Sequence, residues 1–292
     1  MIGTLLDDAK RLAIVAPEYQ DGVGKGLEAE VVFAVAKAVK DAGFPVIARN
    51  HRGEAINGRF VLRGGPGNFD LPTDAQGCCY FDLIFNGDQV FELHNSLELL
   101  GRSRETHEMD VCVLWGVDAD AARAGRQRAL SGPPVVGIEV KEFGLRTPVS
   151  KNIARAFFAC VLDFIPSWAL EAQTIREIIA VAQLGPPELA VDRFWILSTG
   201  RASDETKRFL KAYAIDLIDQ LDQAKLKAAA GRVVGLLNSW AAWRGRDPAA
   251  PKALTVGRRP VSLRPLRKIS PVSAGASIVR IRRPRRLLDL GD

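Results

Sequence analysis

The sequence predicts a mixed α/β fold of the α+β kind, in which helices flank one central sheet, followed by a basic C-terminal tail. Helix-type and strand-type patterns are interleaved over residues 1–243, as expected when both kinds of element pack around one sheet. Asn86-Gly87 lies between two strand-like runs and is a strong hairpin signal. From residue 244 to 292 the chain is rich in Pro, Ala, Ser and Arg with little periodicity, which predicts disorder. We therefore expect a folded domain over 1–243 and a disordered tail over 244–292.

Local patterns predict the elements in chain order. The first half is expected to hold strands at 11–17, 44–50, 80–85, 89–101 and 107–116, a helix at 27–43 that ends at Gly43, and a loop or irregular hairpin at 53–77. The second half is expected to hold a polar insertion through Gly132, strands at 133–143 and 193–200, helices at 151–164 and 167–185, and a helix from Ser203 to about Leu221. Ser150 is the expected cap of the helix at 151–164.

The strand at 89–101 is expected to be half exposed, because its apolar and polar residues alternate. Its apolar face is predicted to hold Phe91, Leu93, Leu97 and Leu99, with Asn95 as the exception. Its polar, exposed face is predicted to hold Glu92, His94, Ser96 and Glu98.

Two charges interrupt the aliphatic run VVGIEVKEF at 135–143. Side chains alternate along a strand, so Glu139 and Lys141 point to one face together. The same parity puts Glu108 and Asp110 on one face of the preceding strand. If the two strands pair, Asp110 and Glu139 become close neighbours.

Carboxylates that lie so close repel each other, and their pKa values rise unless a cation lies between them. Mg²⁺, or Mn²⁺ in its place, suits such a pair because it binds through one or two carboxylates, waters and phosphate oxygens. A neighbouring lysine can orient or deprotonate the attacking water and can stabilise charge that develops on phosphorus. The set is complete for metal-assisted hydrolysis of a phosphodiester. The alternative is that Glu-x-Lys is an ordinary solvated ion pair on an amphipathic strand.

The order of these elements resembles the PD-(D/E)XK nuclease superfamily, which has the restriction-endonuclease-like fold. That family has a helix with a glutamate, a strand with a metal-binding aspartate, a strand with Glu-x-Lys, a helix and a further strand. The similar segments here are 26–50, 107–114, 138–141, 150–164 and 193–199, within a core of 24–222. The pair HEMD…EVK is similar to the GEID…EVK signature of endonuclease and Holliday-junction-resolvase-like branches. No proline precedes Asp110, and residues 53–106 and 117–132 are longer than a minimal core requires.

The resemblance implies a role for each motif residue. Asp110, Glu139 and the Val140 carbonyl would bind the metal, Glu108 would match the extra acid of GEID, and Lys141 would act on the water. Glu30 or Glu28 would be the helix glutamate, and Lys151 and Arg155, which open the following helix, would contact nucleic acid. The resemblance also suggests a homodimer.

The expected activity is that of a Mg²⁺-dependent endonuclease acting on DNA, or RNA. The tail carries 13 Lys and Arg against 3 Asp and Glu, a net charge of +10, so the remaining chain carries −4 of the total of +6. A basic tail attracts polyanions, and nucleic acid is favoured over membrane because no amphipathic helix accompanies it. The alternative is a catalytically silent nucleic-acid-binding or partner-docking module on the same fold.

Other motifs compete with this interpretation. The stretch GVGKG resembles a phosphate-binding loop, but the Walker pattern would need Gly at the position of Tyr19 and Ser or Thr at that of Gly26. A phosphotransferase of that kind would require ATP binding through Lys25. His107 adjoins the acids and could contact a phosphate. Trp240 and Trp243 could stack on nucleic acid or pack in the core.

Location and redox state follow from composition. No apolar run approaches the roughly 18 residues that cross a bilayer, and the N-terminus lacks a basic region of a secretory signal, so a cytoplasmic protein without a membrane span is expected. The four cysteines form no CxxC pair, which predicts buried, reduced thiols.

Overall fold

The computed structural model describes residues 9, 12, 14–20, 25–67, 69, 78–143, 148–168 and 193–244, with backbone alone for 14–20 and 244. These residues belong to one compact unit, Met1–Ala253. The expected tail at 244–292, except for Arg244, and most of the expected helix at 167–185 lie outside the described residues.

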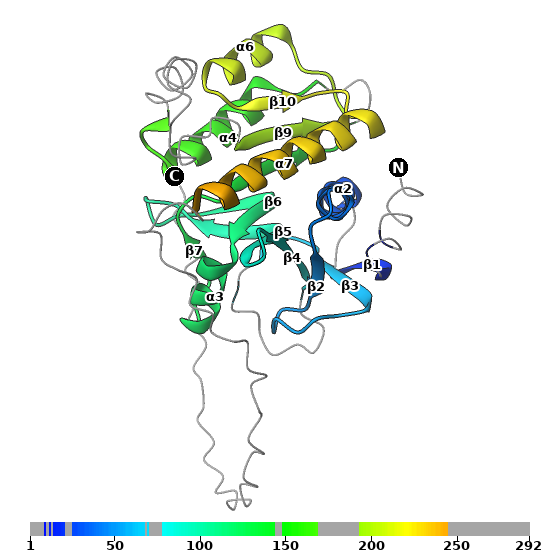
Figure 1. The fold of residues 1–292 in the computed structure, drawn as a ribbon. Helices are drawn as coiled ribbons and strands as arrows, with labels where there is room; N and C mark the ends of the chain where they lie inside the picture. The colour runs from blue at the N-terminus through cyan, green and yellow to red at the C-terminus, as the bar shows by residue number, and fades with distance from the viewer. Residues whose placement is uncertain are drawn as a thin grey trace, which may run out of the picture. The chain divides into compact units, whose positions relative to one another are not determined.

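A mixed sheet of eight strands forms the centre of the described part (Figure 1). Its strand order is β10-β9-β8-β6-β5-β4-β2, and β7 pairs with β5. Strands β8, β9 and β10 run parallel, and the pairs from β8 to β2 are antiparallel. The strands are β2 (Val46–Arg49), β4 (Tyr80–Phe85), β5 (Gln89–Leu100), β6 (Thr106–Trp115), β7 (Leu130–Ser131), β8 (Val136–Lys141), β9 (Phe194–Ser198) and β10 (Asp216–Ile218). The predicted mixed α/β class is confirmed.

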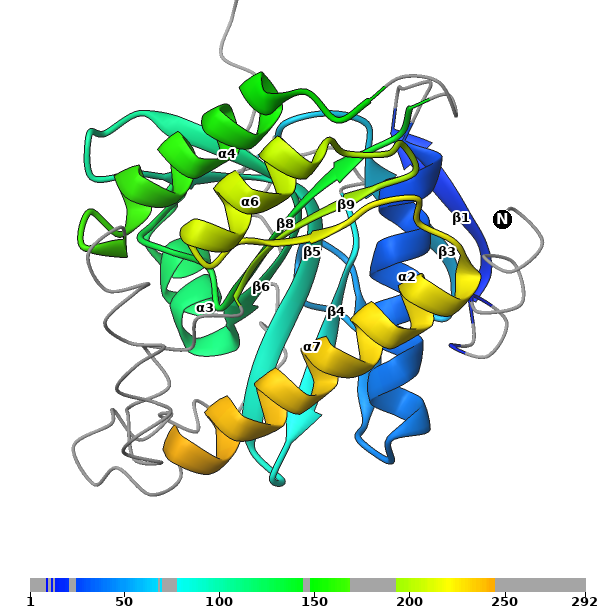
Figure 2. The same cartoon turned by 90° about the horizontal axis from the view of Figure 1, so that it is seen from above.

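Helices cover both faces of this sheet. In the described part they are α2 (Gly26–Asp41), α3 (Gly116–Ala124), α4 (Lys151–Phe164), α6 (Asp204–Ala212) and α7 (Gln223–Arg244). Figure 2 shows α4 and α6 on one side of the sheet and α2 and α7 on the other. Two hydrophobic clusters match these layers, one built on α2 and α7 and the other on α4 and α6. The sheet is therefore buried on both faces over its central strands.

A second, two-stranded parallel sheet of β1 (Ile14–Gln20) and β3 (Gly58–Arg63) lies beside α2 (Figures 1 and 2). Phe33 of α2 joins this sheet to the main one, because its ring meets Phe60 at 5.3 Å and Phe81 at 5.4 Å, both edge-to-face. Edge-to-face contact is a favoured geometry for aromatic pairs. Strand β3 corrects the prediction of a loop or irregular hairpin over 53–77.

Several local predictions are confirmed. The hairpin at Asn86-Gly87 joins β4 to β5, and both residues have positive φ, which Asn and Gly adopt most readily. Ser150 caps α4, since its hydroxyl accepts a hydrogen bond from the Ile153 amide. Gly43 follows α2 with a φ of +89°, the left-handed conformation that ends many helices.

Two predicted segments were wrong. The polar insertion through Gly132 contains α3 and β7. The helix expected from Ser203 to about Leu221 ends at Ala212, and the chain turns at Ala214 (φ +52°) into β10. Ser203 does cap α6, as its hydroxyl accepts from the Thr206 amide. The long helix α7 follows and packs against α2.

Strand β5 is buried along most of its length, so the prediction of a half-exposed strand was wrong. Its charged residues are compensated inside the protein: Arg123 of α3 donates hydrogen bonds to Glu92, and the His94 ring nitrogen Nε2 lies 3.0 Å from Glu92 Oε2. The predicted single apolar face is also wrong. Phe91 and Leu93 belong to the cluster of α2 and α7, whereas Leu97 and Leu99 belong to that of α4 and α6.

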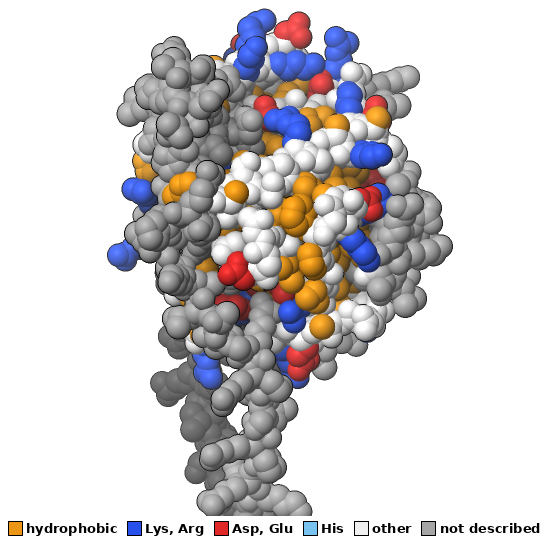
Figure 3. Space-filling view, viewed as in Figure 1, with side chains coloured by type: hydrophobic (Ala, Val, Ile, Leu, Met, Phe, Trp, Pro, Cys, Tyr) orange, Lys and Arg blue, Asp and Glu red, His pale blue; other side chains and the backbone are white. Residues whose placement is uncertain are grey.

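The surface seen in Figure 3 is mixed. Lys and Arg side chains lie over α6, and hydrophobic side chains gather near α2 and α7. Three of the four cysteines, Cys78, Cys79 and Cys112, are buried, as expected. No helix within the described ranges combines the length and apolarity needed to cross a bilayer.

Candidate active site

Strands β6 and β8 pair in antiparallel fashion, as the sequence predicts. Their register joins Val111 to Ile138, and one further step brings Asp110 beside Glu139. The Lys141 ammonium bridges the two acids, 3.2 Å from Asp110 Oδ2 and 2.6 Å from Glu139 Oε1. The structure therefore places these three side chains together.

Asp110 also fixes the end of the β6–β8 ladder. Its Oδ2 accepts a hydrogen bond of 2.8 Å from the Val140 amide, where a regular ladder would use a backbone carbonyl. A carboxylate that accepts from a backbone N–H is held in one orientation. The Asp110 side chain is only 8% exposed and that of Lys141 30%, so the acid is sheltered and the lysine reaches solvent.

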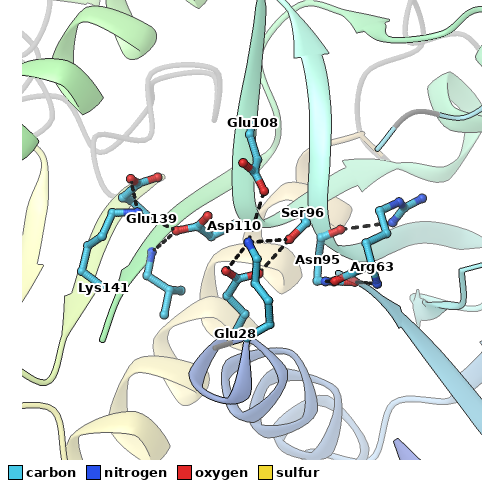
Figure 4. A network of polar contacts seen from close by, with 10 residues as sticks. Glu28, Arg63, Asn95, Ser96, Glu108, Asp110, Glu139 and Lys141 are labelled. Carbon is cyan, nitrogen blue, oxygen red and sulfur yellow. Dashed lines mark hydrogen bonds and ion pairs between the residues drawn. The ribbon is translucent and has the colours of Figure 1, made fainter. Parts of the chain in front are cut away.

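The start of α2 contributes the other half of the site (Figure 4). Glu28 lies in the first turn of α2, and its Oε2 accepts a hydrogen bond of 2.8 Å from the Ser96 hydroxyl of β5. The Lys25 ammonium, immediately before the helix, lies 2.7 Å from Glu28 Oε1 and 3.3 Å from Glu108 Oε1. It also donates to Ser96 Oγ at 3.2 Å. Figure 4 shows Asp110 between this group and the group of Glu139 and Lys141.

Ser96 has the backbone geometry of a residue under constraint. Its φ is +44°, in the left-handed region that a serine within a strand rarely adopts. This residue separates the part of β5 that faces α2 and α7 from the part that faces α4 and α6. Next to it, Asn95 holds Arg63 of β3 through its own side chain and carbonyl, which anchors the irregular segment (Figure 4). Backbone strain of this kind clusters at functional sites.

Strand β6 changes faces at the same level. Met109 packs with Cys112 and Leu114, so the strict alternation predicted for 107–114 is interrupted at Asp110. Glu108 turns toward Lys25 of the α2 layer, and the Asp110 carboxylate acts on the same ammonium, which agrees with the prediction that the two acids share one face. The interruption follows Asp110, because Val111 joins the cluster of α2 and α7.

The carboxylates of the site repel one another. Burial and the neighbouring Asp110 carboxylate raise the pKa of Glu139 to about 7, although Lys141 opposes the shift. Burial and Asp110 also raise the pKa of Glu28, against the effect of Lys25 and Ser96. These shifts are what a cluster of acids with too few cations produces.

Both lysines stay protonated at neutral pH. Burial alone would lower the pKa of Lys141, but Glu139 and Asp110 outweigh it and raise the pKa to about 12. Burial likewise acts to lower the pKa of Lys25, and Glu28, Glu108 and Asp110 together raise it. Counting Glu28, Glu108, Asp110 and Glu139 as carboxylates and Lys25 and Lys141 as ammonium groups gives a formal charge of −2, which one divalent cation would balance.

The donor set suits a hard divalent cation. Asp110, Glu139 and the Val140 carbonyl offer oxygen ligands of the kind that Mg²⁺ prefers. The lysines hold the acids in pairs, and among the residues with described side chains no three Asp, Glu, His or Cys groups converge as a ready-made metal cluster. The case for a divalent cation therefore depends on the oxygen donors and on the formal charge of −2, which a cation would balance.

The remaining predicted residues have mixed positions. Glu28, rather than Glu30, lies in the polar network: Glu30 is two residues further along α2, about 200° around the helix axis, on another face. Lys151 begins α4 and forms an ion pair with Glu205 of α6. Arg155 is exposed one turn later on α4. His107 is held away from the acids, with its Nε2 2.7 Å from Asp163 Oδ2 of α4.

Sequence reasoning missed Lys25 and Ser96 as parts of the site. Lys25 was considered only as a phosphate-loop lysine, yet its position three residues before Glu28 places the two side chains side by side on one face of the helix start. Carboxylate oxygens of Glu28 and Glu108 lie beside its ammonium, and their negative charge would repel nucleotide phosphates. Ser96 was assigned to the polar face of an exposed strand, and no local pattern marks its backbone conformation.

Comparison with known proteins adds no family. No family model and no curated protein matches the chain. One similar solved structure is titled as the crystal structure of a protein of unknown function, AF1548, with a TM-score of 0.27 and 16% sequence identity. The match covers 48% of this chain and 58% of that one, so the chain spans little more than half of its neighbour's length. At this level of similarity the neighbour indicates neither a family nor a function.

Proposed function

We propose that the protein is a metal-dependent nuclease that hydrolyses DNA phosphodiester bonds, on a restriction-endonuclease-like fold. The observation that carries this proposal is the meeting of Asp110, Glu139 and Lys141 at the end of the β6–β8 pair. A charge deficit of two at a partly exposed site is what a divalent ion and a phosphodiester together require, since the ion binds both the acids and the phosphate oxygens.

Each residue has a role that its contacts support. Asp110, Glu139 and the Val140 carbonyl would hold Mg²⁺ or Mn²⁺, which supplies a Lewis acid for the phosphoryl oxygen and lowers the pKa of its bound water. The Val140 amide keeps Asp110 oriented. Lys141 remains an ammonium, so its charge favours orienting the water and stabilising the transition state over removing a proton. Glu139 has a pKa of about 7 without metal, and a bound cation would favour the ionised carboxylate that serves as a ligand.

The α2 side supports the same site. Glu28 takes the part of the helix glutamate, and Ser96 holds its carboxylate in place. Glu108, the extra acid of the predicted motif, adds negative charge that raises the pKa of Glu139. Arg155 and Lys151 on α4, together with the basic residues of 244–292, would attract the DNA backbone by charge.

The test is cleavage of plasmid and single-stranded DNA with Mg²⁺, Mn²⁺ or EDTA, with RNA as a parallel substrate. We expect metal-dependent cutting by the full chain, reduced by about 10²- to 10³-fold in Asp110→Asn and in Lys141→Met, the size of loss that follows removal of one transition-state contact. Lys227→Met, at an exposed position of α7, and Glu142→Gln, at an exposed position next to Lys141, are charge-matched controls expected to keep activity.

Each result decides between the two functions. Binding of DNA without cutting, unchanged in Asp110→Asn, would contradict the nuclease and support a silent nucleic-acid-binding module. Cutting that persists in both site variants would place the activity elsewhere. Circular dichroism of each variant checks that the fold is intact.

A further inference from the structure

Lys25 occupies the centre of a small oxygen-lined position between α2, β5 and β6. Three oxygens surround its ammonium: Glu28 Oε1 at 2.7 Å, Ser96 Oγ at 3.2 Å and Glu108 Oε1 at 3.3 Å. The side chain of Lys25 is 20% exposed and that of Glu28 is 8% exposed, so the position is mostly sheltered from water. Two carboxylates and a hydroxyl are ligands of the kind that also bind hard metal ions.

This position is electrostatically part of the candidate active site. Asp110 raises the pKa of both Glu28 and Lys25, so its charge acts on this position. Removing the charge of Lys25 would change the formal charge of the site from −2 to −3. One divalent ion would then no longer balance the acids.

We propose that the Lys25 ammonium is a built-in cation, which fills the position between Glu28 and Glu108 and so limits the site to one divalent ion at Asp110 and Glu139. This inference rests on the proposed function, because it takes Asp110 and Glu139 as the metal ligands. It assigns Lys25 to charge neutralisation at the site. The lysine holds Glu28 and Glu108 together, and it cannot act as a base while its proton is retained.

The test counts bound Mn²⁺ on the full-length protein, from the free Mn²⁺ signal in electron paramagnetic resonance during a titration. Wild type is expected to bind one Mn²⁺ per chain. Lys25→Met keeps the length of the side chain and removes its charge, so the oxygens of Glu28 and Glu108 become available and a second Mn²⁺ binds. Lys25→Met/Glu28→Gln loses a ligand of that position and returns to one Mn²⁺. Lys25→Arg keeps the charge and stays at one.

Outcomes that overturn the inference are direct. The inference is wrong if wild type binds two Mn²⁺, if a folded Lys25→Met protein binds one, or if Lys25→Arg binds two. If Lys25→Met does not fold, Glu28→Gln alone decides: its count stays at one if Lys25 holds the second position, and a fall below the wild-type count shows that metal binds at Glu28.

The cleavage assay separates this inference from the proposed function. A wild type that binds one Mn²⁺ and gains a second in Lys25→Met, but cuts no nucleic acid, refutes the nuclease and leaves the role of Lys25 standing. A wild type that cuts DNA with two bound Mn²⁺ refutes the role of Lys25 alone. A wild type that binds no Mn²⁺ refutes both.

Discussion

Replacing Glu139 by glutamine is expected to stabilise the metal-free protein at alkaline pH. Glutamine has nearly the shape of a protonated glutamate, so the substitution removes a charge and keeps the packing and the oxygen that faces Lys141. In wild type, burial and the repulsion from Asp110 disfavour that charge. A stabilising substitution within an active site is the expected sign of acids held together for function.

The magnitude and its pH window follow from the pKa shift. The pKa of Glu139 rises from an ordinary value of 4.5 to about 7, which corresponds to about 3 kcal/mol. Between these two values the folded protein holds a proton that the unfolded chain has released, so the free energy of unfolding falls as the pH rises. Wild type and Glu139→Gln should therefore be equally stable below the ordinary pKa. The variant should be more stable by about 3 kcal/mol at about pH 8.

The assay is urea unfolding of both full-length proteins in EDTA, followed by tryptophan fluorescence across this pH range. EDTA matters because a bound cation would neutralise the acids and hide the effect. Glu142→Gln, at an exposed neighbouring position, is the matched control and should show no gain that grows with pH. A Glu139→Gln protein no more stable than wild type at about pH 8 would refute the electrostatic reasoning.

Three further predictions test the surrounding structure. Phe33→Ala should lower the free energy of unfolding by about 3 to 5 kcal/mol, because it removes a fully buried ring that packs against Phe60 and Phe81; a loss below about 1 kcal/mol in urea unfolding would contradict this packing. Glu92→Gln should cost about 3 to 5 kcal/mol in the same measurement, because it breaks the buried ion pair between Glu92 and Arg123, and a loss no greater than that of the exposed Asp41→Asn would contradict this. Asp163→Asn should lower the melting temperature and leave DNA cleavage unchanged, because Asp163 accepts hydrogen bonds from Ser103 and contacts His107 away from Asp110 and Glu139. The pKa of Asp163 is lowered to about 2, so its contribution to stability is lost as the pH falls from the ordinary pKa of an aspartate toward 2. A loss of cleavage in this variant would indicate that His107 takes part in the reaction.

The sequence was informative where local chemistry decides the structure. Asn86-Gly87 and Ser150 fix a hairpin and a helix start through their own backbone preferences and hydrogen bonds. The meeting of Asp110 and Glu139 also followed from sequence, because strand order and side-chain parity are enough to bring them together. The sequence feature that indicated the site was the pair of charges, Glu139 and Lys141, within an otherwise aliphatic strand.

The rest depended on packing between distant segments. Glu92 and His94 were expected in solvent because isolated charges avoid the core, but Arg123, about 30 residues away, compensates them inside the protein. The alternation of side chains in β5 is interrupted at Ser96, where no neighbouring glycine or proline in the sequence indicates an unusual backbone conformation. The choice of Glu28 over Glu30 depends on how α2 is rotated against β5 and β6, which its own pattern leaves open.

The position of a bound Mn²⁺ in a crystal of the full-length protein, located by its anomalous scattering, tests the central claim most directly. The account predicts a peak within about 2.5 Å of oxygens from Asp110 and Glu139, absent in Asp110→Asn. A Mn²⁺-saturated crystal with no peak at these two residues, or with its peak at acids elsewhere, would contradict it.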